Sequence, residues 1–237
     1  MLSTQLSPHV TPAIRKLSPS KQRDYNSRLG HIVHALIATF GAMYALLTSP
    51  EFSEASQAVE LSRWRPGNLS VLHAVTDLSS ATFAFSLGYF IADSLMMLLV
   101  HTQTLGVMLV HHIAGAVALL SVLHTSQCHL YGLILLSTEM TTPFINLRWM
   151  LDKLNYRHTL LYTINGACIF SGWVLGRILL FLYLFTHMWQ HRHIMSDLSV
   201  CIQIVAPAIS IGLFILNLVW FIKICKGLTQ MCAGKQA

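Results

Sequence analysis

Two adjacent histidines, His111 and His112, lie in the middle of a long apolar segment of the chain. Only two carboxylates, Asp93 and Glu139, occur between positions 78 and 151. Imidazole and carboxyl groups together can accept and donate protons, as acid–base catalysis and polar ligand binding require. Ionisable groups inside a membrane cost about 3 kcal/mol or more each, and they usually face a bundle interior or a cavity. The histidine pair therefore marks a candidate binding or catalytic site.

The composition is that of a membrane protein. Of the 237 residues 54% are apolar and 10% are charged, and the mean hydropathy is +0.58. Soluble domains carry about 25% charged residues. Since backbone polar groups in lipid must be satisfied within the protein, we expect an all-α fold, a polytopic membrane bundle of about six transmembrane helices.

Segments of roughly 20 apolar residues predict the helices that must position the pair. The predicted spans are 31–49, 80–100, 105–125, 129–148, 159–185 and 198–223. The fifth is longer than a bilayer needs, which predicts a tilt or an extension beyond the membrane. Residues 1–28 are predicted to be a polar basic tail without a cleavable signal peptide. The membrane domain is expected at 29–226 and a short tail at 227–237.

The distribution of Lys and Arg predicts the orientation of these spans. With a cytoplasmic N-terminus the cytoplasmic side collects Arg15, Lys16, Lys21, Arg23, Arg28, Arg148, Lys153, Arg157, Lys223, Lys226 and Lys235. The opposite side keeps Arg63, Arg65 and Arg192. Both termini are therefore predicted to be cytoplasmic. The net charge of +6 is accounted for by this topology and by anionic lipid, so we expect no nucleic-acid partner.

Depth along the spans brings Asp93 and His111 together. At 1.5 Å per residue, Asp93 lies ~10 Å and His111 ~9 Å from the cytoplasmic ends of their spans. A tight turn at 101–104 joins the two spans, so an Asp–His contact is expected in the cytoplasmic half. Adjacent residues of a helix point ~100° apart. Only one of His111 and His112 is therefore expected to face a cavity, while the other braces it.

The fourth span brings further polar groups near the same depth. Pro143 cannot donate to the carbonyl of Glu139, which predicts a kink or a loosened helix at 137–143. A broken helix at membrane depth is tolerated where it is buried in protein or lines a cavity. The predicted lipid-cavity residues are Asp93, His111, His112, Glu139, Asn146 and Asn165, and the predicted structural residues are Pro143, Arg148 and Arg177. The alternative is that each polar group only bonds one helix to another.

Other histidines and the cysteines give weaker signals. Imidazole suits iron, and membrane di-iron oxygenases use several histidine boxes resembling His187, His191 and His193. That group is predicted to lie across the membrane from the His111 pair, so we expect a solvated loop there and no metal site. The five cysteines have no C-x-x-C spacing, which argues against a zinc site or a disulfide framework. They are Cys128, Cys168, Cys201, Cys225 and Cys232.

Several segments together resemble the TLC-domain family, which includes the longevity-assurance ceramide synthases. They are Tyr25-Asn-Ser-Arg28, His34-Ala35, Gly88-Tyr89 with Asp93, His111-His112, Glu139-Met-Thr-Thr-Pro-Phe-Ile-Asn-Leu-Arg-Trp149, Ile164-Asn-Gly166 with Arg177, and Asn217-Leu-Val-Trp220. In order and spacing they are most similar to the TLC domain-containing protein 4 group, from about residue 20 onward. The resemblance implies a multi-pass protein of the endoplasmic reticulum or another endomembrane, with the plasma membrane as the alternative, that takes part in lipid homeostasis.

The sequence departs from this family in two ways. Members of the group usually have another hydrophobic helix before the Asn-Ser-Arg segment, whereas a polar stretch stands there in this chain. Either the gene model lacks that helix or this member dispenses with it. Ceramide synthases follow their histidine pair with a later His-Asp and a further Asp, and this chain has Glu139-Met140 and then Pro143 instead. Half of the acid–base set is absent.

Three functions remain open from the sequence. The leading expectation is a lipid-homeostasis protein without assured catalysis, whose polar cavity binds the headgroup or acyl chain of a membrane lipid. The first alternative is an acyl-CoA-dependent N-acyltransferase with His111 or His112 as base and Asp93 as its orienting group. Acyl-CoA is expected as a co-substrate only in that case, and no other cofactor is expected. The second alternative is a lipid transporter or scramblase. The lipid and the oligomeric state stay open.

Overall fold

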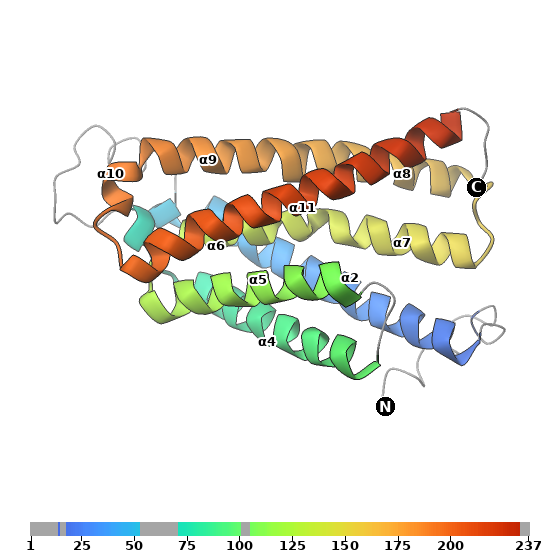
Figure 1. Cartoon of the computed structure of the whole chain (residues 1–237), viewed down its shortest axis with the longest axis horizontal. Coiled ribbons are helices and arrows are strands. Elements are labelled where there is room, and N and C mark those ends of the chain that lie inside the picture. The colour runs from blue at the N-terminus through green and yellow to red at the C-terminus, as the bar shows by residue number, and fades with distance from the viewer. Residues whose placement is uncertain (1–13, 15–17, 53–70, 101–104, 233–237) are drawn as a thin grey trace.

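The computed structural model describes residues 14, 18–52, 71–100 and 105–232. Within this part of the chain every regular element is a helix and no strand occurs. The long helices run side by side along the long axis of the molecule (Figure 1). The predicted all-α membrane bundle is confirmed.

Five helical runs of the described residues are long and apolar enough to cross a membrane. They are α2 (Pro19–Thr48), α4 (Asp77–Val100), α5 (Leu105–Thr125), the joined run of α8 (Leu160–Trp173), η5 (Val174–Leu179) and α9 (Leu180–Gln190), and α11 (Val200–Cys232). A sixth pass is built from α6 (His129–Ser137), η4 (Thr138–Thr141) and α7 (Thr142–Lys153). Short elements at the bundle end are η2 (Pro50–Phe52), η3 (Val71–His73) and α10 (Arg192–Met195).

The outward faces of the long helices carry large apolar side chains. Leu99 is 81% exposed, Leu47 is 78% exposed and Phe40 is 70% exposed. Water would oppose so much exposed apolar surface, whereas lipid tails are as apolar as these side chains. The protein is therefore an integral multi-pass membrane protein.

Several helices extend beyond the predicted spans, most clearly α2 and α11. α2 begins at Pro19 and not near residue 31, so part of the predicted polar tail is helical. Proline suits the first turn of a helix because its missing N–H has no partner there in any case. The polar turns of α2 also pack, since Asn26 is buried and the Arg28 guanidinium lies 4.2 Å from the Trp149 ring centre. α11 likewise continues to Cys232.

The break predicted around Pro143 is present as the 3₁₀ turn η4. The Thr142 N–H bonds to the Glu139 carbonyl, which takes the place of the bond that Pro143 cannot make. An i→i+3 bond tightens the helix locally. This break lies in the bundle interior, because α6 and η4 are buried along almost their whole length. Glu139 is thereby held between the surrounding helices.

The first turn of α2 and the last turn of α11 lie at the same end of the bundle, together with the connection between α7 and α8 (Figure 1). The connection from α5 to α6 and the short helix α10 lie at the other end. An even number of passes returns the chain to its starting side, so six passes account for this arrangement.

Candidate functional site

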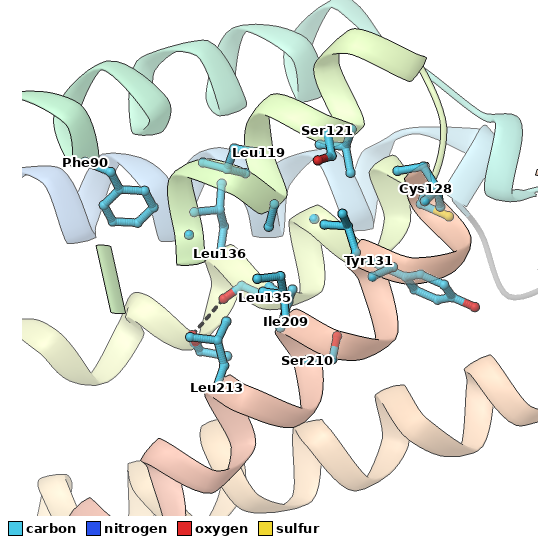
Figure 2. Close-up of a pocket in the computed structure, with 18 of the residues that line it drawn as sticks. Phe90, Leu119, Ser121, Cys128, Tyr131, Leu135, Leu136, Ile209, Ser210 and Leu213 are labelled. Atoms are coloured by element: carbon cyan, nitrogen blue, oxygen red, sulfur yellow. Dashed lines mark hydrogen bonds between the residues drawn. The ribbon is translucent and has the colours of Figure 1, made fainter. Parts of the chain in front are cut away.

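A narrow cavity of about 60 Å³ lies between α5, α6 and α11. Figure 2 shows Leu119 of α5, Leu135 and Leu136 of α6, and Ile209 and Leu213 of α11 around it. Most of the lining is apolar, and none of it is Lys or Arg. A water needs roughly 10–15 Å³ of such space, so the cavity suits a slim chain or a few waters.

The cavity has one charged end, formed by His111 and Glu139. His111 Nε2 lies 3.9 Å from Glu139 Oε1. The Thr142 hydroxyl donates a hydrogen bond of 2.7 Å to Glu139 Oε2. The far end is bordered by Ser121, Cys128 and Tyr131 (Figure 2). His111 and Ser121 are ten positions apart on one helix, or about 15 Å, which gives the length of the cavity along α5.

Arg177 lies next to the charged end of the cavity without lining the cavity itself. Its Nε donates to the Thr141 hydroxyl over 2.8 Å, and its Nη1 donates to Asn217 Oδ1 over 2.9 Å. Its Nη2 lies 3.4 Å from the Thr142 hydroxyl, which itself donates to Glu139. The buried cation is thus linked to the buried carboxyl through one hydroxyl. Arg177 lies in η5, a π-helical segment, and such segments are frequent at functional sites.

Trp220 contacts His111, and Trp173 packs behind Trp220. The Trp220 ring meets the His111 ring edge-on, with the centres 5.5 Å apart, and it meets Trp173 in the same way at 6.2 Å. The Arg177 guanidinium lies 4.6 Å from the Trp173 ring centre. Edge-to-face pairs of this kind are specific in geometry. Trp220 therefore packs against the imidazole of His111 at the end of the cavity.

His112 contacts the other carboxylate. Its Nδ1 lies 3.1 Å from Asp93 Oδ2, a close contact that is not aligned as a hydrogen bond. Asp93 Oδ1 lies 3.3 Å from His31 Nε2 on α2, within hydrogen-bond distance. Beside them the rings of His34 and Tyr89 stack, with centres 3.8 Å apart. Asp93 therefore contacts His112 and not His111, the histidine that the depth argument paired with it.

The two histidines thus play different parts. His111 reaches the cavity and Glu139, whereas His112 joins α5 to α4 and, through Asp93, to α2. This is the division expected from the ~100° between adjacent helical residues. Glu139 is thus the acidic partner of His111, which faces the cavity, and Asp93 is the acidic partner of His112.

Four of the six predicted cavity residues do not line the cavity: Asp93, His112, Asn146 and Asn165. Their polar groups bond helices together instead. Asn146 accepts a 3.0 Å hydrogen bond from Arg28 and donates to the Thr142 carbonyl. Asn165 donates to the Phe144 carbonyl.

The predicted structural residues also have defined contacts. Arg148 donates to the Tyr162 carbonyl, and its guanidinium lies 3.9 Å from the Tyr162 ring centre. Arg148 therefore joins α7 to α8. Pro143 stands at the start of α7, directly after η4, and Arg177 joins η5 to α11 and η4 as described above.

The prediction of a solvated loop at 187–193 is wrong. His187 lies in α9 and is 4% exposed, and His191 is fully buried. Their rings stack with centres 3.9 Å apart, and His187 Nδ1 lies 3.1 Å from the Tyr131 hydroxyl. The helix continues past the predicted end of its span at 185, so these rings pack inside the bundle. Among the described residues, no group of three or more His, Cys, Asp or Glu side chains is arranged as metal ligands.

Sequence reasoning missed several partners of the site. Thr142, Asn217 and Trp220 carry its hydrogen bonds and ring contacts, and His31 binds Asp93. Asn217 and Trp220 stand in a segment that resembles the family, but that resemblance assigns them no partner. No feature of the sequence around His31 indicates that it contacts Asp93. Its contact with Asp93 depends on how α2 crosses α4, which sequence spacing does not contain.

Comparison with known proteins gives a consistent result over nearly the whole chain. The model of the TLC domain matches residues 24–226. TLC domain-containing protein 4-B from Danio rerio is 29% identical over 239 residues, covering 99% of this chain and 84% of that protein. TLC domain-containing protein 4 from Homo sapiens is 28% identical over 237 residues, covering 95% of this chain and 82% of that protein.

Proposed function

This chain belongs to the TLC-domain family, and on that premise we propose that it acts in lipid homeostasis by holding one lipid chain in the cavity between α5, α6 and α11. One observation carries the proposal. The cavity is narrow and apolar along α5, and it ends on a histidine and a carboxyl group. Such a shape fits an amphiphile with one inserted chain and a small polar group at the His111 end.

The lining favours a neutral hydroxyl-bearing group over a phosphate. No Lys or Arg lines the cavity, and the carboxyl of Glu139 would repel an anion. A hydroxyl can donate to that carboxyl and accept from an imidazole N–H, or the reverse. We therefore take a monoacylglycerol as the representative ligand.

We further propose that both termini face the cytoplasm and that the protein resides in the endoplasmic reticulum or another endomembrane. The excess of Lys and Arg on the proposed cytoplasmic side supports this orientation. Labelling with a membrane-impermeant thiol reagent tests it. Two variants are compared, each with a single cysteine. One keeps only Cys201, on α11 near the α10 end, and the other keeps only Cys225, near the other end of α11. Only the Cys225 variant should react with the reagent added on the cytoplasmic side.

The lipid-binding proposal is tested with a variant that fills the cavity. Ala206 lines the cavity, whereas Ala208, two positions later on α11, is exposed on the outside. Ala206→Phe should abolish saturable binding of a radiolabelled monoacylglycerol to the purified full chain in detergent. Ala208→Phe adds the same side chain to the lipid-facing side and should bind as the unchanged protein does.

Two results would contradict the proposal. One is equal binding by Ala206→Phe and the unchanged protein, when thermal unfolding curves show that both proteins are folded. The other is equal loss in both phenylalanine variants, which would place any binding on the outer surface.

An acyl-CoA-dependent N-acyltransferase is the second candidate, favoured by the pairing of His111 with Glu139 at the cavity end. In that reaction the amine would attack the thioester carbonyl, the C–S bond would break and the amide C–N bond would form. His111 would take the proton from the amine and pass it to the departing CoA thiolate, while Glu139 lies beside the imidazole. Purified protein, acyl-CoA and a panel of long-chain amines should then give an amide, and His111→Ala should not. If no amine in the panel is acylated, the enzyme candidate is rejected and the binding proposal is unaffected.

A further inference from the structure

A second pocket opens on the outside of the bundle between α9, α10 and α11, with a volume of about 410 Å³. We call it the outer groove, and we define it by Phe185, Met188, Trp189, Arg192, Gln203 and Ile211. It lies where the membrane span Leu160–Gln190 ends and the span Val200–Gln230 begins. Lipid headgroups and their linkages lie at this depth.

The polar end of the outer groove is Arg192. Its Nη1 donates a 2.9 Å hydrogen bond to the Trp189 carbonyl, and its guanidinium lies 4.8 Å from the Trp189 ring centre. Among the described residues Arg192 takes part in no ion pair. A guanidinium has five N–H donors, so most of them stay available. Arginine at such a place can bind a phosphate through two parallel hydrogen bonds.

The rest of the outer groove is apolar. Phe185, Met188 and Ile211 form its wall on the side that continues into the membrane spans. Methionine is flexible and fits irregular apolar surfaces. A groove with an arginine at the interface and an apolar wall below it is complementary to an anionic headgroup with an attached acyl chain.

We propose that the outer groove binds one phospholipid, with its phosphate on Arg192 and an acyl chain along Phe185, Met188 and Ile211. Pro207 adds to the polar character of the groove, because a proline inside a helix leaves the carbonyl of Gln203 without its usual donor. That carbonyl can accept from the hydroxyl groups of a glycerol headgroup.

This site is separate from the inner cavity and does not rest on the function proposed above. α11 lies between the two, with Ile202, Ala206 and Ile209 lining the cavity and Gln203 and Ile211 lining the outer groove. The two sites also differ in chemistry, since the cavity lining has a carboxyl group and no Lys or Arg, whereas the groove contains Arg192. Neither ligand should displace the other.

The test measures lipid retained by the purified full chain in a neutral detergent, using native mass spectrometry and phosphatidylglycerol as the probe. The unchanged protein should retain one phosphatidylglycerol. Arg192→Gln removes the charge and should lower its occupancy by about tenfold, whereas Arg192→Lys should retain part of it. Arg23→Gln, on an exposed arginine at the other end of the bundle, is the matched control and should bind normally.

Two further arms identify what is bound. Diacylglycerol has the acyl chains without the phosphate. The amount of diacylglycerol retained should therefore be the same in Arg192→Gln and in the unchanged protein. Millimolar inorganic phosphate should not displace the lipid, because the apolar wall contributes to its binding. Equal retention by Arg192→Gln and the unchanged protein would overturn the proposal, as would an equal loss in Arg23→Gln. Displacement by inorganic phosphate would show an anion site and would overturn the assignment to a phospholipid.

Discussion

At the residue scale, the two adjacent histidines contact two different carboxylates. His111 contacts Glu139 at the end of the cavity, and His112 contacts Asp93, which also contacts His31. Each imidazole therefore has an acidic neighbour, which offsets part of the cost of a polar group at membrane depth. The difference in position predicts a difference in function between two adjacent, identical side chains.

Replacing each histidine should separate binding from stability. His111→Ala removes a hydrogen-bonding group from the cavity and should raise the Kd of a monoacylglycerol about tenfold. His112→Ala leaves the cavity unchanged and should alter that Kd by less than about twofold, while it lowers the thermal unfolding midpoint because Asp93 loses a partner. Binding and unfolding are measured on the same detergent preparations. The reverse pattern would contradict the assignment of His111 to the cavity.

The second residue-scale prediction concerns the buried pair of Arg177 and Glu139. Arg177→Met removes the cation that Thr142 links to the carboxyl, and it should lower the free energy of unfolding by about 3 kcal/mol, as when one partner of a buried ion pair is removed. Adding Glu139→Gln should restore part of this loss, because the uncompensated carboxyl is gone. Denaturant unfolding of the single and double variants measures both effects. Purely additive losses would show that the two groups are not coupled.

The residue scale also shows where sequence reasoning ends. That Asp93 would lie near the histidine pair could be predicted, because depth along two helices joined by a tight turn is fixed by 1.5 Å per residue, but the predicted partner was His111 and the observed partner is His112. That Glu139 would contact His111, and that Asn146 and Asn165 would bond helices together, could not. Those outcomes depend on the rotation of each helix about its axis, which packing decides.

At the element scale, the 3₁₀ turn η4 sets the direction of Glu139. A 3₁₀ helix turns by about 120° per residue and an α-helix by about 100°. Over the four residues of η4 the difference amounts to about 80° between α6 and α7. Glu139 is the second residue of this turn, so part of the added rotation lies before it and part after it. The break therefore changes how Glu139 faces relative to α7.

Pro143→Ala tests the role of this break. Alanine supplies the N–H that the Glu139 carbonyl lacks from position 143, so the turn can relax into an α-helix. Thermal stability should stay the same or rise, since a proline next to a helix interior is replaced by a good helix former. Monoacylglycerol binding should fall nonetheless. A variant that is more stable and binds normally would show that η4 does not position the site.

The break itself was predictable from the sequence, because proline lacks an N–H whatever surrounds it. The burial of His187 and His191 was not. A charge count places a histidine relative to the membrane, but it does not tell whether the helix continues past the apolar segment. Here α9 extends to Gln190 and both rings pack inside the bundle.

At the scale of the whole molecule, the fold follows from the hydrophobic pattern. Apolar residues cover the outward faces of α2, α4, α5 and α11, and the polar side chains are gathered inside. Among these inside groups Glu139 and Arg177 belong to one polar cluster, Asp93 to another, and His187 and His191 to a third. The apolar cavity begins at the first of them. Composition reveals the bundle, whereas the cavity is left where three helices fail to fill the space between them.

The most direct test of the lipid-binding account is an experimental structure of the full chain with a monoacylglycerol that carries bromine at the end of its acyl chain. With data collected at the bromine absorption edge, the account predicts one anomalous peak within the cavity, near Ser121 and Cys128 at the end away from His111. The glycerol group should then lie beside His111 and Glu139. A cavity without a bromine peak, or a peak only on the outer faces of the helices, would contradict the account.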